Sequence, residues 1–374
     1  MQAAAFDPGA VLAALARYPS LPSDGRRVAV VGGFVRDIWL GREPRELDLV
    51  VEGDAGALAR ALGGEVVVHE PFGTATATGP GWRVDVAMAR RERYPSPGAL
   101  PQVEPAALEQ DLERRDFTIN AVAVTVEGGE LLAAQGALDD LERGLLRVLH
   151  ARSFVDDPTR LLRLARYSTR LGFEVEPQTA GLAAQTDLGT LSGSRLGGEL
   201  RLALAEPDPV GVLALLAAKL PLDIDRGLVE QALALAPPES DRAMLVLGAL
   251  TREEEWLGTL ELTSRELEVA LACHRVGASV PGAAPSALWR AWRGLPIEAV
   301  AVAGARGEPA AASDWIERLR HVGLQIGGDD LLAAGLTQGP AIGRRLELAL
   351  AAKLDGVIAG GREAELAYAL EVER

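Results

Sequence analysis

Two adjacent glycines followed by an acidic pair are the first residues in this chain whose types and spacing could do chemistry. Gly32 and Gly33 end a hydrophobic run and open a segment that carries Arg36 and Asp37. Glycine lets a backbone approach an anion closely, and the first N–H groups of a following helix point at the same spot. The Arg36 guanidinium can add a bidentate contact to phosphate oxygens. The segment therefore predicts a phosphate-binding turn.

The acidic pair, Glu46 and Asp48, stands two residues apart in a strand-like run, so both side chains point to one face. Two carboxylates on one strand face can hold Mg²⁺ beside a bound triphosphate. Each half has an ordinary reading by itself, since strand–glycine–helix turns are common and acidic pairs often form a solvated strand edge. Their close succession favours a joint nucleotide and metal site, with Glu46 and Asp48 as the metal ligands.

A second charged segment reads Arg114-Arg-Asp-Phe-Thr-Ile-Asn120. Arg114 and Arg115 can neutralise phosphate charge, while Asp116 and Asn120 can hydrogen-bond sugar hydroxyls. The alternative is a charged helix start that Asp116 caps. We interpret the segment as part of the nucleotide site.

These segments resemble the class II tRNA nucleotidyltransferase and bacterial poly(A) polymerase family, within the superfamily that contains polymerase β. The run from Arg114 to Ala121 matches the family motif without a mismatch, and in the family it contacts the ribose and phosphates of the incoming nucleotide. The resemblance implies two Mg²⁺ ions and a third catalytic carboxylate. Asp85, in the alternating run from Trp82 to Met88, is the residue in that position.

One residue departs from the family pattern, because the first metal-binding carboxylate is normally aspartate and here it is Glu46. Glutamate can still bind Mg²⁺, but its extra methylene moves the oxygens by roughly 1 Å, a misplacement that can cost on the order of 100-fold in rate. Either the strand has adjusted to the longer side chain, or Asp48 and Asp85 carry most of the metal binding.

The segment Phe154-Val-Asp-Asp-Pro-Thr-Arg160 opens an arginine-rich helix and resembles the family element that reads the base of the incoming nucleotide. Asp157 can accept from an exocyclic amine, and Arg160 can donate to ring nitrogen or carbonyl acceptors. Both C and A carry such an amine beside an acceptor, so this pair could select them over G and U. The alternative is plain N-capping of the helix by Asp156 or Asp157, with Pro158 in its first turn, and it is compatible with base reading because the cap does not need Arg160.

Further along, Arg163, Arg166 and Arg170 fall on one side of the same helix. A basic strip beside a nucleotide site is where an RNA 3′ end would lie, and the alternative is a solvated helix face. Arg195 and Glu199 resemble a bracing element of the family, and their spacing would let them pair across one helix turn.

Composition favours an intracellular, cytoplasmic enzyme. The 374 residues carry a net charge of −15, are 48% hydrophobic and include one cysteine, Cys273, which excludes an internal disulfide and a cysteine zinc cluster. No apolar stretch is long enough to span a bilayer, and the N-terminus shows no signal-peptide pattern, so no membrane partner is expected. The acidic net charge argues superficially against RNA, but the arginines near the motifs are locally in excess.

Strand and helix patterns place these motifs in an α+β protein. The resemblance implies a polymerase-β-like nucleotidyltransferase head, a mixed sheet with helices, followed by an all-helical C-terminal region. A loop over the site is expected from Arg91 to Gly98. The predicted domains are a head at 1–142, a helical neck for base reading and RNA 3′-end contact at 143–210, a helical body at 211–295 and a tRNA-binding tail at 296–374. The predicted strands are Val28–Val31, Leu47–Val51, Glu65–Val68, Thr74–Thr78, Arg83–Met88 and Ala121–Val126.

The resemblance implies template-independent addition of C, A or both to the tRNA 3′ end from CTP and ATP, with release of pyrophosphate. Expected partners are the acceptor end and the elbow of tRNA. Alternatives are an enzyme adding only CC or only the terminal A, a poly(A) polymerase, and a non-catalytic RNA-binding relative. The sequence does not indicate an oligomeric state.

Overall fold

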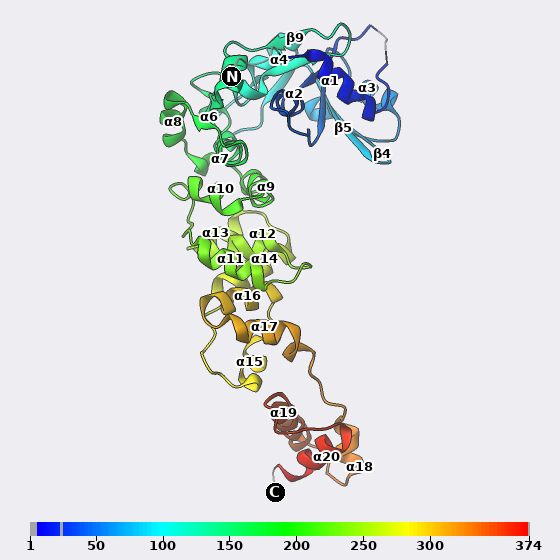
Figure 1. Ribbon diagram of the computed structural model, residues 1–374, viewed down its shortest axis with the longest axis vertical. Helices are drawn as coiled ribbons and strands as arrows, with labels where there is room; N and C mark the ends of the chain where they lie inside the picture. The colour runs from blue at the N-terminus through cyan, green and yellow to red at the C-terminus, as the bar shows by residue number, and fades with distance from the viewer. Residues whose placement is uncertain (1–5, 23–24, 373–374) are drawn as a thin grey trace. The chain divides into compact units, whose positions relative to one another are not determined.

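A computed structural model describes residues 6–22 and 25–372, so the first residues, where no signal pattern was found, lie partly outside the described chain. The chain forms two compact units, Met1–Asp208 and Pro209–Arg374. The first unit mixes strands and helices and the second is built from helices (Figure 1). The predicted α+β class is confirmed.

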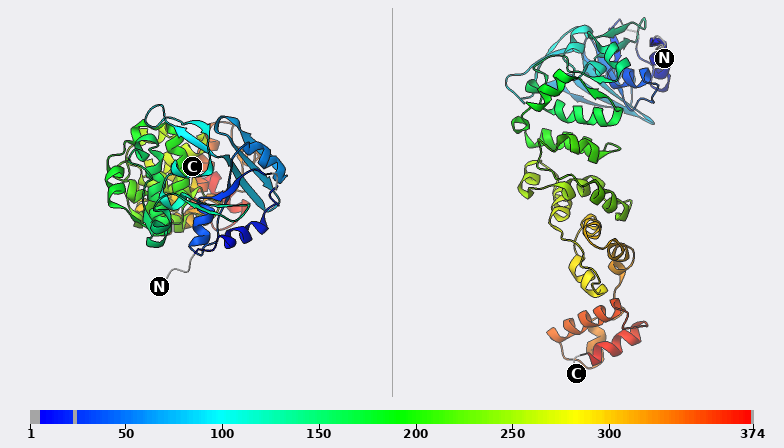
Figure 2. Two further views of the ribbon diagram at one scale, coloured as in Figure 1. Left: turned by 90° about the horizontal axis from the view of Figure 1, so that it is seen from above. Right: turned by 60° about the vertical axis from the view of Figure 1, so that its left-hand side comes forward.

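A seven-stranded mixed sheet forms the centre of the first unit, and its blue and cyan strands can be followed in the right-hand view of Figure 2. Its order is β3-β4-β5-β2-β1-β8-β9; β2 and β5 are parallel, and the other neighbours are antiparallel. All six predicted strands are present. The strands are β1 Val28–Val31, β2 Leu47–Val51, β3 Glu65–His69, β4 Thr74–Gly79, β5 Trp82–Met88, β8 Val122–Thr125 and β9 Leu131–Ala133.

The register of this sheet aligns the predicted carboxylates. Asp48 on β2 is the direct partner of Asp85 on the parallel strand β5. Strand β1 is buried along its whole length, which is why its sequence is a continuous apolar run rather than an alternating one. It ends at the two glycines, so the buried centre of the sheet delivers the turn and the acidic pair to the same edge.

In the first unit, helices α2 and α7 begin within or directly after the predicted motifs. Helix α2 starts at Gly33, directly after the left-handed turn at Gly32, and α7 starts at Thr159, directly after Pro158. A short 3₁₀ turn covers Thr118–Asn120. The helices are α1 Pro8–Ala14, α2 Gly33–Trp39, α3 Ala55–Leu62, α4 Leu108–Glu113, α5 Ala137–Arg143, α6 Ser153–Asp156, α7 Thr159–Leu171, α8 Pro177–Ala184 and α9 Gly193–Leu204.

The loop predicted from Arg91 is partly wrong, because strand β6 (Arg90–Arg93) pairs with β7 (Gln102–Pro105) and only the residues between them form a loop. Charged residues dominate β6, so it lacks the apolar alternation that identifies a strand. Ion pairs hold it instead, since Glu92 accepts from both Arg90 and Arg114.

The predicted head and neck lie in one compact unit, which ends at residue 208, close to the predicted boundary at 210. Backbone contacts cross the predicted boundary at 142, because Phe117 pairs with Val148 and Thr118 N–H donates to the Arg147 carbonyl at 2.9 Å. Helix α7 packs on α9. The predicted neck is therefore continuous with the predicted head. The domain boundary at residue 142 stays a prediction from the sequence.

In the second unit, α16 begins at the predicted body–tail boundary but packs against α11, α12 and α14 of the predicted body. Its sequence is apolar nearly throughout, so it needs cover on several faces. The last three helices share a separate apolar cluster centred on Leu331, Ala349 and Ala369. The helices are α10 Pro209–Leu216, α11 Arg226–Leu235, α12 Arg242–Leu250, α13 Glu254–Thr259, α14 Ser264–Arg275, α15 Pro285–Trp292, α16 Ile297–Arg306, α17 Pro309–Glu317, α18 Gly328–Ala333, α19 Pro340–Leu354 and α20 Arg362–Glu371.

Among the described residues, no helix is both long enough and apolar enough to cross a bilayer.

Candidate active site

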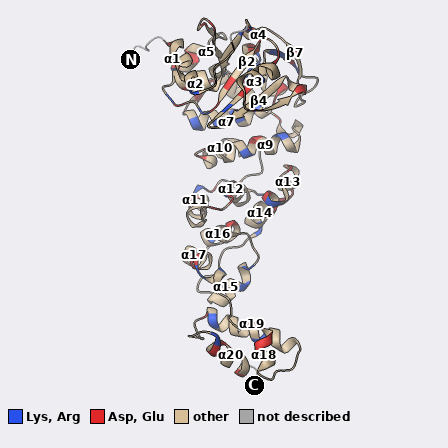
Figure 3. Ribbon diagram, turned by 90° about the vertical axis from the view of Figure 1, so that its right-hand side faces the viewer, with Lys and Arg blue, Asp and Glu red and all other residues tan. Residues whose placement is uncertain are grey.

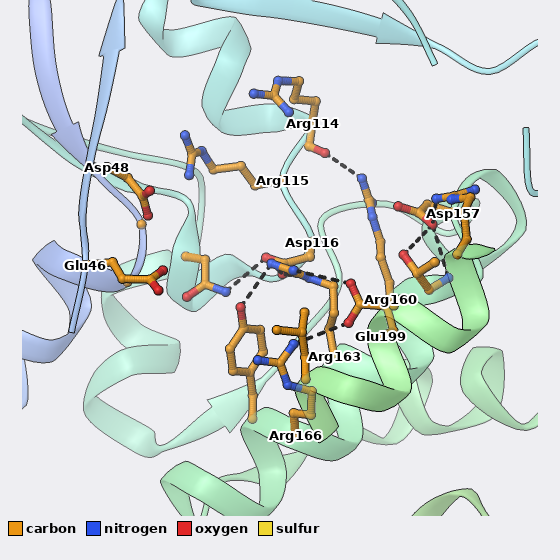
Figure 4. A pocket seen from close by; sticks show the side chains of 18 of the residues that line it. Glu46, Asp48, Arg114, Arg115, Asp116, Asp157, Arg160, Arg163, Arg166 and Glu199 are labelled. Atoms are coloured by element: carbon orange, nitrogen blue, oxygen red, sulfur yellow. Dashed lines mark hydrogen bonds and ion pairs between the residues drawn. The ribbon is translucent and has the colours of Figure 1, made fainter. Parts of the chain in front are cut away.

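One cavity of about 1160 Å³ in the first unit collects nearly all the predicted site residues (Figure 4). Its walls come from α2, the loop before β2, the segment after α4, and helices α7 and α9. Eleven arginines and eight carboxylates line it, an excess of three positive charges in a chain whose net charge is −15. The cavity therefore suits a highly anionic ligand.

The glycine turn is built for a close approach. Gly32 has φ 65°, and a Cβ at this position would lie 3.0 Å from Nη1 of Arg115. Gly33 begins α2, so the helix N-terminus faces the cavity that both glycines line. A side chain at Gly32 would strain the backbone and displace Arg115 together.

Gly32→Ala is expected to lower stability by about 1–3 kcal/mol, because a non-glycine residue is forced to positive φ. It should also raise the KM for nucleotide about tenfold by displacing Arg115. Gly41→Ala is the matched control, since Gly41 has φ 66° and a Cβ there meets nothing within 4 Å. Thermal unfolding and nucleotide titration measure both effects. Equal KM values for the two variants would remove the Arg115 contact from the explanation.

Arg36 is buried, and its guanidinium donates to Asp37 Oδ1 at 2.7 and 2.8 Å and to Asn120 Oδ1 at 2.6 Å. It therefore ties the glycine turn to the segment after α4. Arg36 and Asp37 line the cavity, and their contact with phosphate stays a prediction. Asp37 acts here as the counter-charge that keeps this buried guanidinium in place.

The acidic pair lies at one end of the cavity, with Asp85 on the adjacent strand. The pKa of Asp48 is raised to about 6, chiefly by burial, with the carboxylates of Asp85 and Glu46 adding to the rise and Arg115 opposing it. Asp85 is partly satisfied, because it accepts from Thr76 Oγ1 at 2.6 Å and pairs with Arg83 at 3.2 Å. Asp48 is thus the carboxylate with the strongest need for a cation.

This donor set suits Mg²⁺. The ion prefers oxygen ligands and is usually held by one or two carboxylates together with substrate phosphates. Within residues 6–22 and 25–372, no three His, Cys, Asp or Glu side chains lie close enough together to form a metal site by themselves. A site made by Glu46 and Asp48 that a substrate phosphate completes agrees with both observations.

Arg114 and Arg115 diverge from each other, although both bind Asp111. Arg114 bonds Asp111 Oδ1 and Glu92 Oε1, each at 2.7 Å, and Arg115 bonds Asp111 Oδ2 at 3.0 Å. The Arg115 Nε is buried without a hydrogen-bond partner. Arg115 also lowers the pKa of Asp48, so it lies close enough to that carboxylate for their charges to interact. This guanidinium is the one placed to meet phosphate beside the acidic pair.

Asp116 and Asn120 form a buried network rather than a free sugar-binding pair. Asp116 accepts from the Phe117 N–H at 2.8 Å, Asn120 Nδ2 at 3.0 Å and Arg163 Nη2 at 2.7 Å. Burial raises the pKa of Asp116, but Arg163 and the Asn120 hydrogen bond outweigh it and hold the pKa at about 2. Asp116 is therefore ionised, and its predicted contact with the sugar hydroxyls would add to these bonds.

The predicted base-reading residue, Asp157, accepts hydrogen bonds through one of its two carboxylate oxygens. Asp157 Oδ1 accepts from the Thr159 N–H at 3.1 Å, Thr159 Oγ1 at 2.6 Å and Arg195 Nη2 at 2.7 Å. The other oxygen, Oδ2, has no partner among these donors. The predicted N-cap position is wrong, because Pro158 is the N-cap residue of α7. The bonds of Asp157 at this helix start use only Oδ1, so they are compatible with base reading.

Arg160 is 5% exposed and has no carboxylate among its bonds. Its guanidinium donates to Ser153 Oγ at 2.6 Å and to the Arg114 carbonyl at 2.7 Å. Neutral acceptors fix its position, and its charge interacts with Asp116, whose pKa it helps to lower. Arg160 and Asp157 line the same cavity, as predicted (Figure 4).

The α7 arginines line the cavity and are paired, so they do not form a solvated helix face; Figure 3 marks the charged residues of this helix. Arg166 bonds Glu199 at 3.3 Å and Glu206 at 3.1 Å, and Arg170 bonds Glu206 at 3.5 Å. The expected Arg195–Glu199 pair is replaced by other partners, since Arg195 bonds Asp157 while Glu199 bonds Arg166. Contact of Arg163, Arg166 and Arg170 with RNA stays a prediction.

Several cavity residues were not identified from the sequence, among them Glu92, Tyr94, Tyr167 and Glu206. Glu92 orders Tyr94, whose hydroxyl donates to Glu92 Oε2 at 2.8 Å, and Glu206 is a buried acceptor for α7. Tyr167 lies four residues after Arg163 on α7, a helical spacing that could have placed it beside that arginine. The partners of Glu92 and Glu206 are distant in sequence and gave no such signal.

Comparison with known proteins finds a matching family model and similar solved structures. A family model described as the poly A polymerase head domain matches residues 28–147. A solved structure described as a CCA-adding enzyme in apo form II has a TM-score of 0.79 and 31% identity, covering 93% of this chain and 92% of that chain.

Two curated relatives are also similar. An A-adding tRNA nucleotidyltransferase of Geobacter sulfurreducens is 35% identical over 92% of this chain and 45% of its own length. A CC-adding tRNA nucleotidyltransferase of Deinococcus radiodurans is 47% identical over 49% of this chain and 51% of its own length. The chain thus spans about half the length of the curated relatives it matches.

Proposed function

Because the chain belongs to the tRNA nucleotidyltransferase and bacterial poly(A) polymerase family, we propose that it adds C, A or both to the 3′ end of tRNA. CTP and ATP are the substrates, pyrophosphate is released, and no nucleic-acid template is used. The cytoplasm is the expected location, since its substrates are there.

One observation carries this proposal, the single cavity in which the acidic pair, the glycine turn and the Asp157–Arg160 pair meet. A nucleoside triphosphate has a metal-binding triphosphate at one end and a base at the other. The cavity offers carboxylates and Arg115 for the first, and a carboxylate with a guanidinium for the second. Its excess of positive charge also favours a second anionic ligand, the RNA end.

Different side chains have different roles in phosphoryl transfer, a reaction in which positioning and charge stabilisation supply most of the rate enhancement. The turn at Gly32 and Gly33 cradles the phosphates while Arg115 neutralises them. Glu46 and Asp48 would hold Mg²⁺, which lowers the pKa of the attacking 3′-hydroxyl and stabilises the pyrophosphate leaving group when bound. Attack at the α-phosphorus then proceeds in line.

Base selection follows from the Asp157–Arg160 pair. The free Oδ2 of Asp157 accepts the exocyclic amine of C or A, and Arg160 donates to the neighbouring ring acceptor. Both groups are held rigidly, Asp157 by Thr159 and Arg195, and Arg160 by Ser153. G and U present the opposite pattern of donor and acceptor at this edge and are rejected.

A split activity, adding only CC or only the terminal A, is the second candidate. The two curated relatives at 35% and 47% identity carry A-adding and CC-adding names, which favours it. The motifs themselves are common to both candidates and to poly(A) polymerases. The helical second unit is proposed to bind the tRNA elbow, mainly through shape and backbone contacts.

The test is incorporation of labelled CTP and ATP, with Mg²⁺, into three tRNA transcripts ending before CCA, after C and after CC. Ordered addition of C, C and one A to the first transcript would establish the complete activity. CTP uptake that stops after CC, or ATP uptake only on the CC-ending transcript, would establish a split enzyme. Long A runs would identify a poly(A) polymerase, and no incorporation would leave a non-catalytic RNA-binding protein.

Glu46→Gln is expected to lower the incorporation rate on the order of 100-fold and to raise the Mg²⁺ concentration needed for half-maximal rate. The variant keeps the shape of the side chain and removes only its charge. Glu46→Asp keeps the charge and should retain more activity than Glu46→Gln. Rates measured across a Mg²⁺ titration test this, and an unchanged rate and Mg²⁺ requirement in Glu46→Gln would show that Glu46 is not a ligand.

A further inference from the structure

Three arginines contact the ring of one tyrosine inside the cavity. The guanidinium carbons of Arg36, Arg163 and Arg170 lie 5.4, 5.6 and 5.1 Å from the centroid of the Tyr167 ring. Tyr167 lines the cavity and is 8% exposed. Across residues 6–22 and 25–372, the only other ring with such a contact is Trp289, which has one.

The Tyr167 ring is itself held firmly. It stands edge-on to the fully buried Phe117, with centroids 5.8 Å apart and an interplanar angle of 89°. Its hydroxyl accepts from Arg163 Nη2 at 3.0 Å. The ring therefore cannot move without disturbing the core or the arginine, and it offers a fixed reference surface for the three cations.

An aromatic ring can hold these arginines without neutralising their charge, whereas a carboxylate cannot. Each of the three arginines already has at least one carboxylate partner: Arg36 has Asp37, Arg170 has Glu206, and Arg163 has Asp116 at 2.7 Å and Glu199 at 4.0 Å. A further carboxylate would cancel the positive charge that an anionic ligand needs. The aromatic face attracts a guanidinium through its quadrupole and adds no net charge, so it holds like charges near one another while their field persists.

The three arginines also belong to different parts of the site. Arg36 lies on α2 beside the glycine turn, whereas Arg163 and Arg170 lie on α7, one and three turns from its start. Arg36 bonds Asn120 and Arg163 bonds Asp116, so both reach the segment after α4. The ring contacts both the turn arginine and the helix arginines.

We propose that Tyr167 is a positioning residue whose ring aligns Arg163 and Arg170 for the RNA 3′ end and Arg36 for the nucleotide. This inference rests on the proposed function for the identity of the two ligands. The ring acts through the arginines and touches neither substrate. Its loss would leave the carboxylate pairs intact but free the other end of each guanidinium.

The experiment compares Tyr167→Leu with Tyr167→Phe in the full chain. Tyr167→Leu should raise the KM for tRNA about tenfold, with a smaller change in kcat at saturating tRNA. Tyr167→Phe keeps the ring and should remain within about twofold of the parent in KM. Tyr18→Leu is the stability control, since Tyr18 packs edge-on to Phe34 at 6.1 Å and lies outside the cavity.

A second readout separates positioning from simple destabilisation. RNA affinity is measured against salt concentration, because each lost phosphate contact lowers the slope of log K against log salt by about 1. The slope should fall in Tyr167→Leu and stay unchanged in Tyr167→Phe and Tyr18→Leu. A merely structural role would lower the melting temperature and the active fraction without changing the KM or this slope.

Two results would overturn the inference: a Tyr167→Leu variant with parental KM and slope, or a Tyr167→Phe variant as impaired as Tyr167→Leu. The second would assign the effect to the hydroxyl instead of the ring. Failure of the proposed function is distinguishable, since the parent protein would then incorporate no nucleotide, while the salt slope of RNA binding would still report on Tyr167.

Discussion

An Asp48→Asn variant is expected to lose nucleotide incorporation by on the order of 1000-fold, because a metal ligand supplies several kcal/mol of charge stabilisation in the transition state. Asparagine keeps the size of the side chain and removes its charge. The surrounding strand β2 is buried on both sides of Asp48, so the fold has no reason to change. Activity comparable to the parent would contradict the assignment of Asp48 as the metal ligand.

The same variant is expected to be more stable than the parent when no metal is present. The folded-state pKa of Asp48 is raised to about 6 from 3.8, so the folded protein holds the proton more tightly than the unfolded chain. The stabilising effect of the protonated carboxyl is complete below pH 4 and is lost as the pH rises through 6. A shift of about two pH units corresponds to roughly 3 kcal/mol, which asparagine should recover at pH 7 to 8.

Thermal unfolding with and without Mg²⁺ measures this effect. With CTP present, Mg²⁺ should raise the melting temperature of the parent at pH 7.5 and leave that of Asp48→Asn nearly unchanged, because the variant lacks one of the two carboxylates proposed to bind the ion. Asp139→Asn is a suitable control, since Asp139 is exposed on α5 and lies outside the cavity. A parental response to Mg²⁺ in Asp48→Asn would place the ion elsewhere.

Changes at Asp157 are expected to alter which base the protein accepts. Oδ1 of Asp157 already accepts from Thr159 and Arg195, so in an Asp157→Asn variant the carbonyl oxygen of the new amide would have to take that place. The amide nitrogen would then present a donor where the parent presents an acceptor. A donor favours the O4 of U over the amine of C, so relative use of UTP should rise.

The size of this change follows from base readout, in which a good contact contributes about 1–3 kcal/mol of discrimination, or about 5- to 150-fold. Asp157→Ala should lose selectivity without favouring U, because it presents neither donor nor acceptor. Arg160→Ala should also weaken the choice of C and A over G and U. The measurement is the ratio of kcat/KM for all four nucleotides on one transcript. Unchanged ratios in the Asp157 and Arg160 variants would remove the base-reading proposal.

Local patterns account for what could be predicted. The strands were identified because alternating or continuous apolar runs reflect burial of one or both sheet faces within a few residues, although the apolar run of β3 is largely exposed. The motifs were identified because each is short, and the chemistry of Gly32, Asp48 and Asp157 depends on close neighbours. Strand β6 was missed for the same reason, since its charged residues carry no apolar period and Glu92 is stabilised by Arg114 on a distant segment.

The amino-acid sequence by itself indicated the α+β class and the family, and it supplied the predicted residues of the candidate site but not Glu92, Tyr167 or Glu206. Only the tertiary structure decided how those residues are held. Arg36 bonds Asn120, Arg160 bonds the Arg114 carbonyl, and Arg166 bonds Glu206, each across a long stretch of chain. Such contacts have no local period, because they arise when the sheet and α7 bring separate segments around one cavity. The contacts of three arginines with the Tyr167 ring and the bond from Arg195 to Oδ1 of Asp157 are consequences of that packing.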